Sequence, residues 1–432
     1  MRTWFALAFV AVLLSACATM PVAPATPAQA TVAPADTDAP ADTDAPADAA
    51  DVFTAAFLLA ESPTDQGWNA AHYRGIETLK SLGEVVAEDN LSFTVDMGEK
   101  GILDVVVVED VGYSDADIER VMRSVLNQQS PDIVFATWFD SKDASARLAP
   151  EYPDVYFEHC SGYPLISSGD NLSTYFIRQE YGDYVAGYVT GLLGYANTGL
   201  VGTFPIPEPV RGINGFGLGL QQGLSEAGLD PAESDVRVVW INSWLDPVQE
   251  REAALALVDT GVEAVRQMAD TPHSSQAACS VDGMIAIGYG TDVSPYASCA
   301  VMSNEWNWGA YYVQRVEDAM NDAWTAQDWW GGFEEGAIGI TGWNDELVPA
   351  EVQTMAADLV GEFEAGFDPF CGPISGYGRA QEAGGENAVI EVPAGQCLSD
   401  MDLLTMQWFV DGVSGELPPA PADGFTLELQ PE

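Results

Sequence analysis

The segment that decides the fold is VRVVWINSWLDPVQEREAALALVDTGVEAVRQMADTP, residues 236–272. It begins with β-branched and aromatic residues, which predict a strand that ends near Ile241. Asp246, followed by a proline, is typical of a helix start, and the helix that it predicts ends at Gly261. A second short strand follows at 262–268. The segment is therefore predicted to be a βαβ unit, in which a helix joins two parallel strands.

The ends of these two strands carry candidate binding residues. In open parallel sheets, ligands bind beyond the carboxyl ends of the strands. Trp244 and Asp246 follow the first strand, and Asp270 follows the second. An aromatic ring and carboxylates suit a flat small molecule with polar edges. Because Asp246 is accounted for as a helix cap, we take Trp244 and Asp270 as the candidate residues of this unit.

The same alternation of strands and helices extends in both directions along the chain. Four rounds of strand and helix predict a doubly wound lobe at 52–165, and a further series predicts a second lobe at 166–296. We expect the chain then to cross back, so that 297–340 joins the first lobe and 341–432 the second. Residues 167–171 are interpreted as a hinge. The predicted fold class is α/β, with two doubly wound lobes.

The charge of the chain argues against a nucleic-acid partner. Its 432 residues include 15 Lys and Arg against 66 Asp and Glu, which gives a formal net charge of -51. Binding of nucleic acid depends on cations that neutralise phosphates. Two interpretations of the acidity stay open: adaptation to a saline exterior, and a solvated acidic surface without further meaning.

The N-terminus has the pattern of a bacterial lipoprotein signal. Arg2 precedes an apolar run at 4–14, and Leu-Ser-Ala-Cys ends at Cys17. The run is shorter than the roughly 20 residues that a spanning helix needs. We expect cleavage before Cys17 and lipid on this cysteine, with an ordinary secretory signal as the alternative. Residues 18–51, rich in Ala, Pro, Thr and Asp, predict a disordered tether.

Beyond Cys17 the chain has five more cysteines, in a compartment that the signal predicts to be oxidising. Sequence alone does not fix their connectivity. No CxxC or Cys/His spacing suggests zinc, and the three histidines are scattered, so we predict neither a metal nor a cofactor. Local spacing favours the pairs Cys371–Cys397 and Cys279–Cys299, with Cys160 free and buried.

Seven segments resemble, in order, the basic membrane protein (BMP) family of ABC-transporter substrate-binding lipoproteins, which bind purine nucleosides or nucleobases. The resemblance covers roughly 52–418. It implies a type I periplasmic binding protein fold, in which two lobes close on a ligand about a hinge of crossover strands. The strong acidity, the cysteines and an insertion at 86–101 depart from the family. The segments are DQGWNAAHYRG (65–75), PDIVFATWF (131–139), YPDVYFEHCSGY (152–163), FPIPEPVRGINGF (204–216), NSWLDPVQEREAA (242–254), NEWNWGAYY (304–312) and PFCGPI (369–374).

The resemblance also implies a set of ligand-binding residues. In the family, aromatic side chains from both lobes stack on the purine, and polar side chains hold its edge and any ribose. Each implied residue also lies at or near a predicted strand end, and Asp292 is placed to bind either the base or ribose hydroxyls. For Trp306 and Trp308, closing the cleft and packing at the hinge both stay open. The implied residues are Trp68, Asn69, Trp138, Phe204, Trp244, Asp270 and Asp292.

The sequence thus predicts a monomeric receptor that is anchored to the membrane through Cys17 and faces the periplasm or the cell exterior. It would capture a purine nucleobase or nucleoside and deliver it to an ABC permease, without being an enzyme. One alternative is a receptor for a membrane signalling protein. The other is a nucleoside-hydrolysing enzyme that uses paired carboxylates such as Asp270 and Asp292, although no nucleophile–base motif accompanies them.

Overall fold

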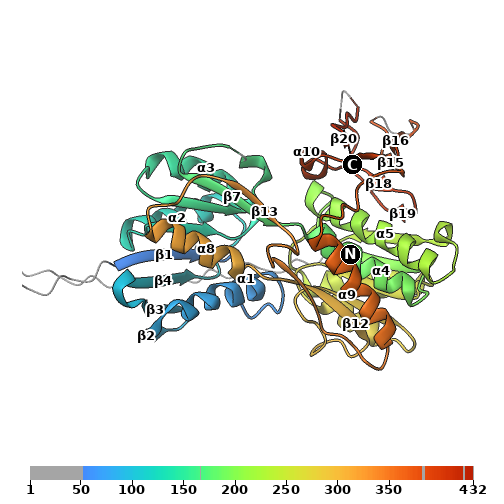
Figure 1. The fold of residues 1–432 in the computed structure, drawn as a ribbon, viewed down its shortest axis with the longest axis horizontal. Coiled ribbons are helices and arrows are strands. Elements are labelled where there is room, and N and C mark those ends of the chain that lie inside the picture. Colours follow the sequence, from blue (N-terminus) through green and yellow to red (C-terminus); the bar gives the residue numbers. More distant parts are fainter. Residues whose placement is uncertain (1–51, 166, 382–384, 422–423, 432) are drawn as a thin grey trace, which may run out of the picture. The chain divides into compact units, whose positions relative to one another are not determined.

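The computed structural model describes residues 52–165, 167–381, 385–421 and 424–431. These residues form two α/β lobes, each built on one largely parallel sheet (Figure 1). No helix among them is both long and apolar enough to span a membrane. The predicted signal peptide and lipobox (1–17) and the predicted tether (18–51) lie outside the described residues.

The first sheet has the strand order β13-β7-β6-β5-β1-β4-β3-β2. Its central strand, β1, is mostly apolar, as expected for a strand in a sheet that is covered on both faces. The insertion at 86–101 falls in an antiparallel hairpin, β2 and β3, at one edge of the sheet. The bounds are β1 Val52–Leu58, β2 Glu84–Asp89, β3 Ser92–Asp96, β4 Ile102–Val108, β5 Ile133–Ala136, β6 Tyr156–Cys160, β7 Leu172–Ile177 and β13 Asp328–Gly331.

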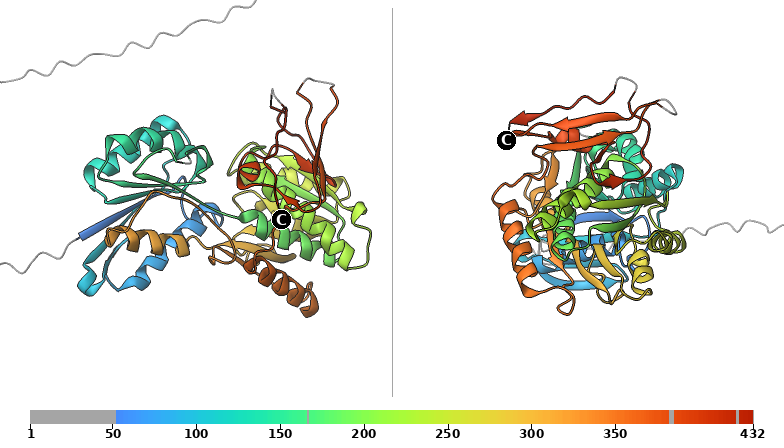
Figure 2. Two further views of the ribbon diagram at one scale, coloured as in Figure 1. Left: turned by 45° about the horizontal axis from the view of Figure 1, so that its top comes forward. Right: turned by 90° about the vertical axis from the view of Figure 1, so that its right-hand side faces the viewer.

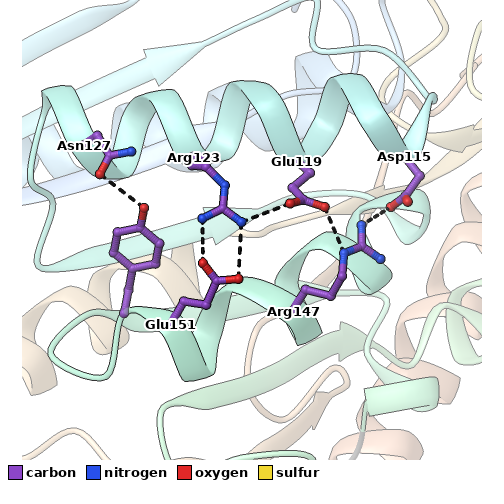
Figure 3. A network of polar contacts seen from close by, with 7 residues as sticks. Asp115, Glu119, Arg123, Asn127, Arg147 and Glu151 are labelled. Atoms are coloured by element: carbon purple, nitrogen blue, oxygen red, sulfur yellow. Dashed lines mark hydrogen bonds and ion pairs between the residues drawn. The ribbon is translucent and has the colours of Figure 1, made fainter.

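Side chains of β1 alternate between two cores. Phe57 packs under α1 (Trp68–Glu77) and α8 (Gly309–Met320), whereas Leu58 packs under α2 (Asp115–Gln128) and α3 (Lys142–Leu148). Outside the second core, Arg123 and Arg147 join α2 to α3 and its neighbouring turn through Asp115, Glu119 and Glu151 (Figure 3). These side chains are exposed, so each pair adds at most about 1 kcal/mol.

The second sheet has the order β14-β12-β11-β10-β8-β9-β19. The predicted βαβ unit is present as β9, α6 (Pro247–Asp259) and β10, and the Asp246 carboxylate accepts from the backbone N–H groups of Val248 and Gln249. The two strands do not pair with each other, because β8 lies between them. The bounds are β8 Asn197–Gly202, β9 Asp235–Trp240, β10 Ala264–Met268, β11 Ile285–Gly290, β12 Ala300–Trp306, β14 Ile338–Thr341 and β19 Val413–Ser414.

Helices cover both faces of this sheet as well. On one face α6 packs beside α7 (His273–Cys279), and on the other α4 (Gln179–Leu192) packs beside α5 (Pro207–Glu226). The contact between α4 and α5 depends on glycine, since a Cβ atom on Gly187 would lie 2.0 Å from the backbone oxygen of Phe216. A further helix, α9 (Ala350–Glu364), packs against α4.

The sheet topology differs from the predicted division at three strands. We expected β7 in the second lobe and β12 and β14 in the first, but β7 pairs with β6, and β12 and β14 pair with each other beside β11. The chain therefore crosses between the lobes after β7, after β12 and after β13. An apolar strand buried on both faces fits either sheet, so its composition does not reveal which one it joins.

The predicted hinge at 167–171 is a loop of the first lobe. Gly169 forms a bridge with Leu172, at the start of β7. The first crossover instead comes at Arg178, between β7 and α4. The guanidinium of Arg178 lies 4.1 Å from the ring centroid of Trp330 and donates to Asp400 Oδ1 at 2.8 Å. A loop rich in Ser and Gly and a hinge look alike in sequence.

The C-terminal part forms small sheets beside α5 (Figure 2). The pairs Cys371–Cys397 and Cys279–Cys299 are confirmed as disulfides, and Cys160 is free and buried, as predicted.

The C-terminal elements are β15 Ile374–Gly378, β16 Ala388–Val392, β17 Gln396–Cys397, α10 Asp400–Leu404, β18 Phe409–Val410 and β20 Gln430–Pro431. Short 3₁₀ helices lie at η1 Thr78–Leu82, η2 Gly98–Lys100, η3 Phe139–Ser141, η4 Ala149–Glu151, η5 Tyr163–Leu165 and η6 Pro231–Glu233.

Candidate functional site

A cavity lies between the two lobes, where the carboxyl ends of the strands of both sheets meet. Its empty space, which includes the opening to solvent, is about 450 Å³. Both lobes line it to a similar extent. The first lobe contributes Ala60, Trp68, Tyr113, Trp138, Phe139 and Ser161, and the second contributes Thr203, Glu208, Pro209, Trp244, Met268, Asp270 and Tyr289.

Around the cavity the lobes touch directly. The backbone N–H of Trp68 donates to the backbone oxygen of Asp270 at 3.3 Å, and Trp244 Nε1 donates to Asp140 Oδ2 at 2.9 Å. A Cβ atom on Gly67 would lie 1.5 Å from the Asp270 oxygen, so a larger residue there would push the lobes apart. These contacts are those of a closed cleft.

Aromatic rings form the walls of the cavity. Trp68, 8% exposed, starts α1 and is fixed by a hydrogen bond from its Nε1 to the backbone oxygen of Thr137 at 2.9 Å. Trp138 and Phe139 follow β5. From the other lobe, Trp244 follows β9, and its ring centroid lies 6.4 Å from that of Phe139. Flat ligands stack on such rings.

Two carboxyl groups line the cavity and are its most polar side chains. Glu208 is 4% exposed, and its Oε2 has no hydrogen-bond partner among the described residues. Burial raises the pKa of Glu208, while Arg211 and a hydrogen bond from Ser161 act in the opposite direction. Burial also raises the pKa of Asp270 well above its usual value, with Asp65 and Glu208 adding to the effect. A buried acceptor without a partner is costly and is satisfied when a ligand donates to it.

Four of the residues predicted for the site line the cavity, and three do not. Trp68, Trp138, Trp244 and Asp270 are among the lining residues. Trp138 Nε1 is buried and, within the described residues, lacks an acceptor, so it is a donor that a ligand could use.

The remaining three residues have local roles instead. Asn69 donates from its side chain to Asp65 Oδ2 at 2.8 Å and so shapes the loop before α1. The ring of Phe204 meets that of Trp244 edge-on, with 4.8 Å between the centroids. Asp292 Oδ1 accepts from the backbone N–H of Ser294 at 2.8 Å, which is a turn contact.

Sequence reasoning missed several lining residues. Ser161 and Thr203 come directly after β6 and β8, and Phe139 is the neighbour of Trp138 in the loop after β5, so the strand-end rule would also have found them. Glu208 was harder to find because it lies in the first turn of α5, inside a segment that reads as helix. Trp306 and Trp308 are buried at the second crossover, and neither is among the lining residues, which favours hinge packing.

The loop that carries Asp270 is held by a buried carboxyl. Glu250 Oε2 accepts from Thr271 Oγ1 at 2.6 Å, and burial raises the pKa of Glu250 to about 7. The folded state therefore holds this proton more tightly than the unfolded chain, whose value is near 4.5. Ionising Glu250 in the folded protein therefore lowers the free energy of unfolding. This loss is absent below about pH 4.5, grows as the pH rises and is complete above about pH 7.

Glu250→Gln removes this titration and is expected to stabilise the protein at pH 8 by up to ~3 kcal/mol, with no gain at pH 4.

Urea unfolding at the two pH values measures this effect. Glu252→Gln is the matched control, because it makes the same replacement at an exposed position of the same helix, and it should change stability at pH 8 by less than Glu250→Gln. An equal effect of Glu250→Gln at pH 4 and pH 8 would show that this carboxyl is not the titrating group.

Asp368, Cys371 and Cys397 lie close enough together to hold a metal ion. Cys371 and Cys397 are joined in a disulfide, however, so they do not supply thiolate ligands.

Comparison with known proteins identifies relatives of this chain. The family model for PnrA-like ABC transporter substrate-binding proteins (Bmp) matches residues 53–359. A purine-binding protein of Brucella abortus (strain 2308) is 30% identical over 376 residues, covering 86% of this chain and 95% of the relative. A putative ABC transporter glucose-binding protein, TsgA13, of Haloferax volcanii is 32% identical over 349 residues, covering 79% of this chain and 80% of the relative.

Solved structures support the fold. An ABC transporter solute-binding protein from Conexibacter woesei superposes with a TM-score of 0.56 at 20% identity, covering 73% of this chain and 97% of that one. A solute-binding protein of the same class from Aeropyrum pernix gives a TM-score of 0.57 at 15% identity, covering 73% and 92%. The predicted fold class, a two-lobed binding protein, is thereby confirmed.

Proposed function

Because the chain belongs to the family of PnrA-like ABC transporter substrate-binding proteins, we propose that its interlobe cavity captures a purine nucleobase or nucleoside for delivery to an ABC permease. The observation that carries the proposal is the composition of the cavity. Tryptophans from both lobes face it together with the buried carboxyl of Glu208 and the partly buried carboxyl of Asp270. A purine offers faces that stack on aromatic rings and N–H groups that donate to carboxylates.

A sugar is the second candidate, since one relative is described as a putative glucose-binding protein. Sugars also pack on aromatic rings and donate to carboxylates. A sugar, however, presents hydroxyl groups all round its ring, and each needs a partner when it is buried. The polar lining residues are Tyr113, Ser161, Thr203, Glu208, Asp270 and Tyr289, and the hydroxyl of Tyr289 already donates to Gln179. The aromatic rings of the lining favour a purine.

Tryptophan fluorescence tests the proposal, because Trp68, Trp138 and Trp244 line the cavity. The ligand-free protein is titrated with adenine, adenosine, guanosine, inosine, uridine and glucose, at low and at molar salt in view of its charge. Saturable binding of a purine at micromolar or lower concentration supports the proposal. Saturation with glucose alone, or no response to any of the six by folded protein, contradicts it.

The closed cleft also suggests how the protein works. Each lobe supplies about half of the lining, so the open form would hold the ligand by one lobe, and closure would bury it. The closed form then presents to the permease a surface that the open form lacks. A receptor for a membrane signalling protein would use the same closure, and release of ribose from a bound nucleoside would instead reveal an enzyme.

We further propose that the protein acts as a monomer outside the cytoplasm, held at the membrane through a lipid on Cys17. The pattern of residues 1–17 supports a lipoprotein signal, and that of 18–51 supports a tether. Cys17→Ser is expected to move the expressed protein from the membrane fraction to the soluble extracytoplasmic fraction. Membrane retention of this variant after a high-salt wash would contradict the anchor.

A further inference from the structure

Glu208 stands out among the polar residues of the cavity. It lies in the first turn of α5, lines the cavity and is nearly fully buried. The nearby cation, Arg211, pairs through its Nε with Glu180 Oε2 at 3.2 Å. Glu208 Oε2 meets no donor among the described residues. It is therefore an acceptor that a ligand or a water molecule can satisfy.

Glu208 supplies the carboxyl oxygen of this lining that has no partner among the described residues. Glu208 and Asp270 are its two carboxyls, and the described lining includes neither lysine nor arginine. A ligand edge with N–H groups satisfies such acceptors. A ring carbonyl at the same place would bring two acceptors together and leave both without a donor. We therefore expect the cavity to bind a ring with an amino group more tightly than the same ring with an oxo group at that position.

The site also offers little to a ribose. Asp292, the residue that the sequence suggested for ribose hydroxyls, is used in a turn and lies outside the lining. At the end of β11 the lining residue is Tyr289, whose hydroxyl already donates to Gln179 Oε1 at 2.8 Å. The polar groups thus match the edge of a base better than a base with a sugar attached.

Building on the proposed purine function, we propose that Glu208 determines specificity: its carboxylate accepts N–H groups from the edge of a free amino-bearing purine base. Adenine and hypoxanthine form the probe pair: adenine has an amino group at position 6 and an acceptor at N1, whereas hypoxanthine has an oxo group at position 6 and an N–H at N1. The protein is expected to bind adenine about 10- to 100-fold more tightly than hypoxanthine, as a hydrogen bond to a charged group would give. It should also bind adenine more tightly than adenosine.

Calorimetric titration of the wild type and Glu208→Gln with adenine, hypoxanthine and adenosine tests this inference. Glutamine has both a donor and an acceptor, so the variant should lose adenine affinity by about 10- to 100-fold. Its preference for adenine over hypoxanthine should fall to within about threefold. Asp246→Asn is the control, because this carboxylate caps α6 outside the lining, and it should keep the wild-type preference.

The outcomes separate the two proposals. Wild-type protein that binds none of the three purines would overturn the proposed function. If the wild type binds purines but does not discriminate adenine from hypoxanthine, or if Glu208→Gln keeps the wild-type ratio, the role of Glu208 is overturned alone. Adenosine bound as tightly as adenine would overturn the free-base assignment, since the ribose would then be accommodated.

Discussion

Trp244→Ala is expected to weaken ligand binding roughly 30- to 150-fold while the protein stays folded. Trp244 forms the aromatic wall that the second lobe contributes beside Phe139. Loss of one stacking ring costs about 1–3 kcal/mol, and the upper part of that range applies because a second contact disappears with it. That contact is the hydrogen bond from Trp244 Nε1 to Asp140 Oδ2, which joins the lobes. Calorimetric titration with the ligand identified by fluorescence measures the loss.

Two further variants make this result specific. Trp343→Ala is the matched control, because Trp343 is also partly buried but lies outside the lining of the cavity. Trp244→Phe keeps a stacking ring and removes only the indole N–H, so it should lose less affinity than the alanine variant. Unchanged affinity in Trp244→Ala would remove this residue from the binding site.

Arg315→Ala is expected to lower the free energy of unfolding by about 3–5 kcal/mol near neutral pH. In the first lobe, Glu158 Oε1 accepts from Arg315 Nε at 2.8 Å and from Trp324 Nε1 at 2.7 Å, and Glu158 Oε2 accepts from the Tyr311 hydroxyl at 2.6 Å. Glu158 and Arg315 are both buried. Removing the arginine leaves a buried charge without its counter-ion, and this costs far more than a lost surface pair.

The pH dependence identifies the cause of this loss. Burial already raises the pKa of Glu158, and Arg315 opposes that shift, so the pKa rises further in Arg315→Ala. The loss in free energy of unfolding caused by Arg315→Ala then becomes smaller as the pH drops toward 4.5, the pKa of Glu158 in the unfolded chain, because the carboxyl becomes neutral. Urea unfolding at pH 5 and pH 8 should show the difference.

Two controls accompany this measurement. Arg120→Ala removes an exposed arginine paired with Asp117 and should cost less than about 1 kcal/mol. A double variant, Glu158→Gln with Arg315→Met, should recover much of the loss, because neither buried charge remains. A cost below 1 kcal/mol for Arg315→Ala itself would contradict the role of this pair.

Some features of this protein can be predicted from the pattern of neighbouring residues in the sequence. The βαβ unit at 236–272 was predicted because its strands, its Asp246 cap and its glycine stop are each specified by neighbouring residues. The spacing of the cysteines likewise gave both disulfides. The strand-end rule selected Trp244 and Asp270, the family resemblance added Trp68 and Trp138, and all four line the cavity.

Tertiary structure decided what depends on partners far away in the chain. Which sheet β7, β12 and β14 join is set by their pairing with other strands, and their amino-acid composition fits either sheet. Asn69 and Asp292 have suitable side chains at suitable strand ends, but each is taken up by a neighbour, Asp65 and the backbone of Ser294. Glu208 enters the cavity because the first turn of α5 lies against it. The sequence by itself determined the two-lobed α/β class and the region of the site, since these follow from local periodicity. The set of side chains that face a ligand depends on which elements pack together, and only the folded chain decides that.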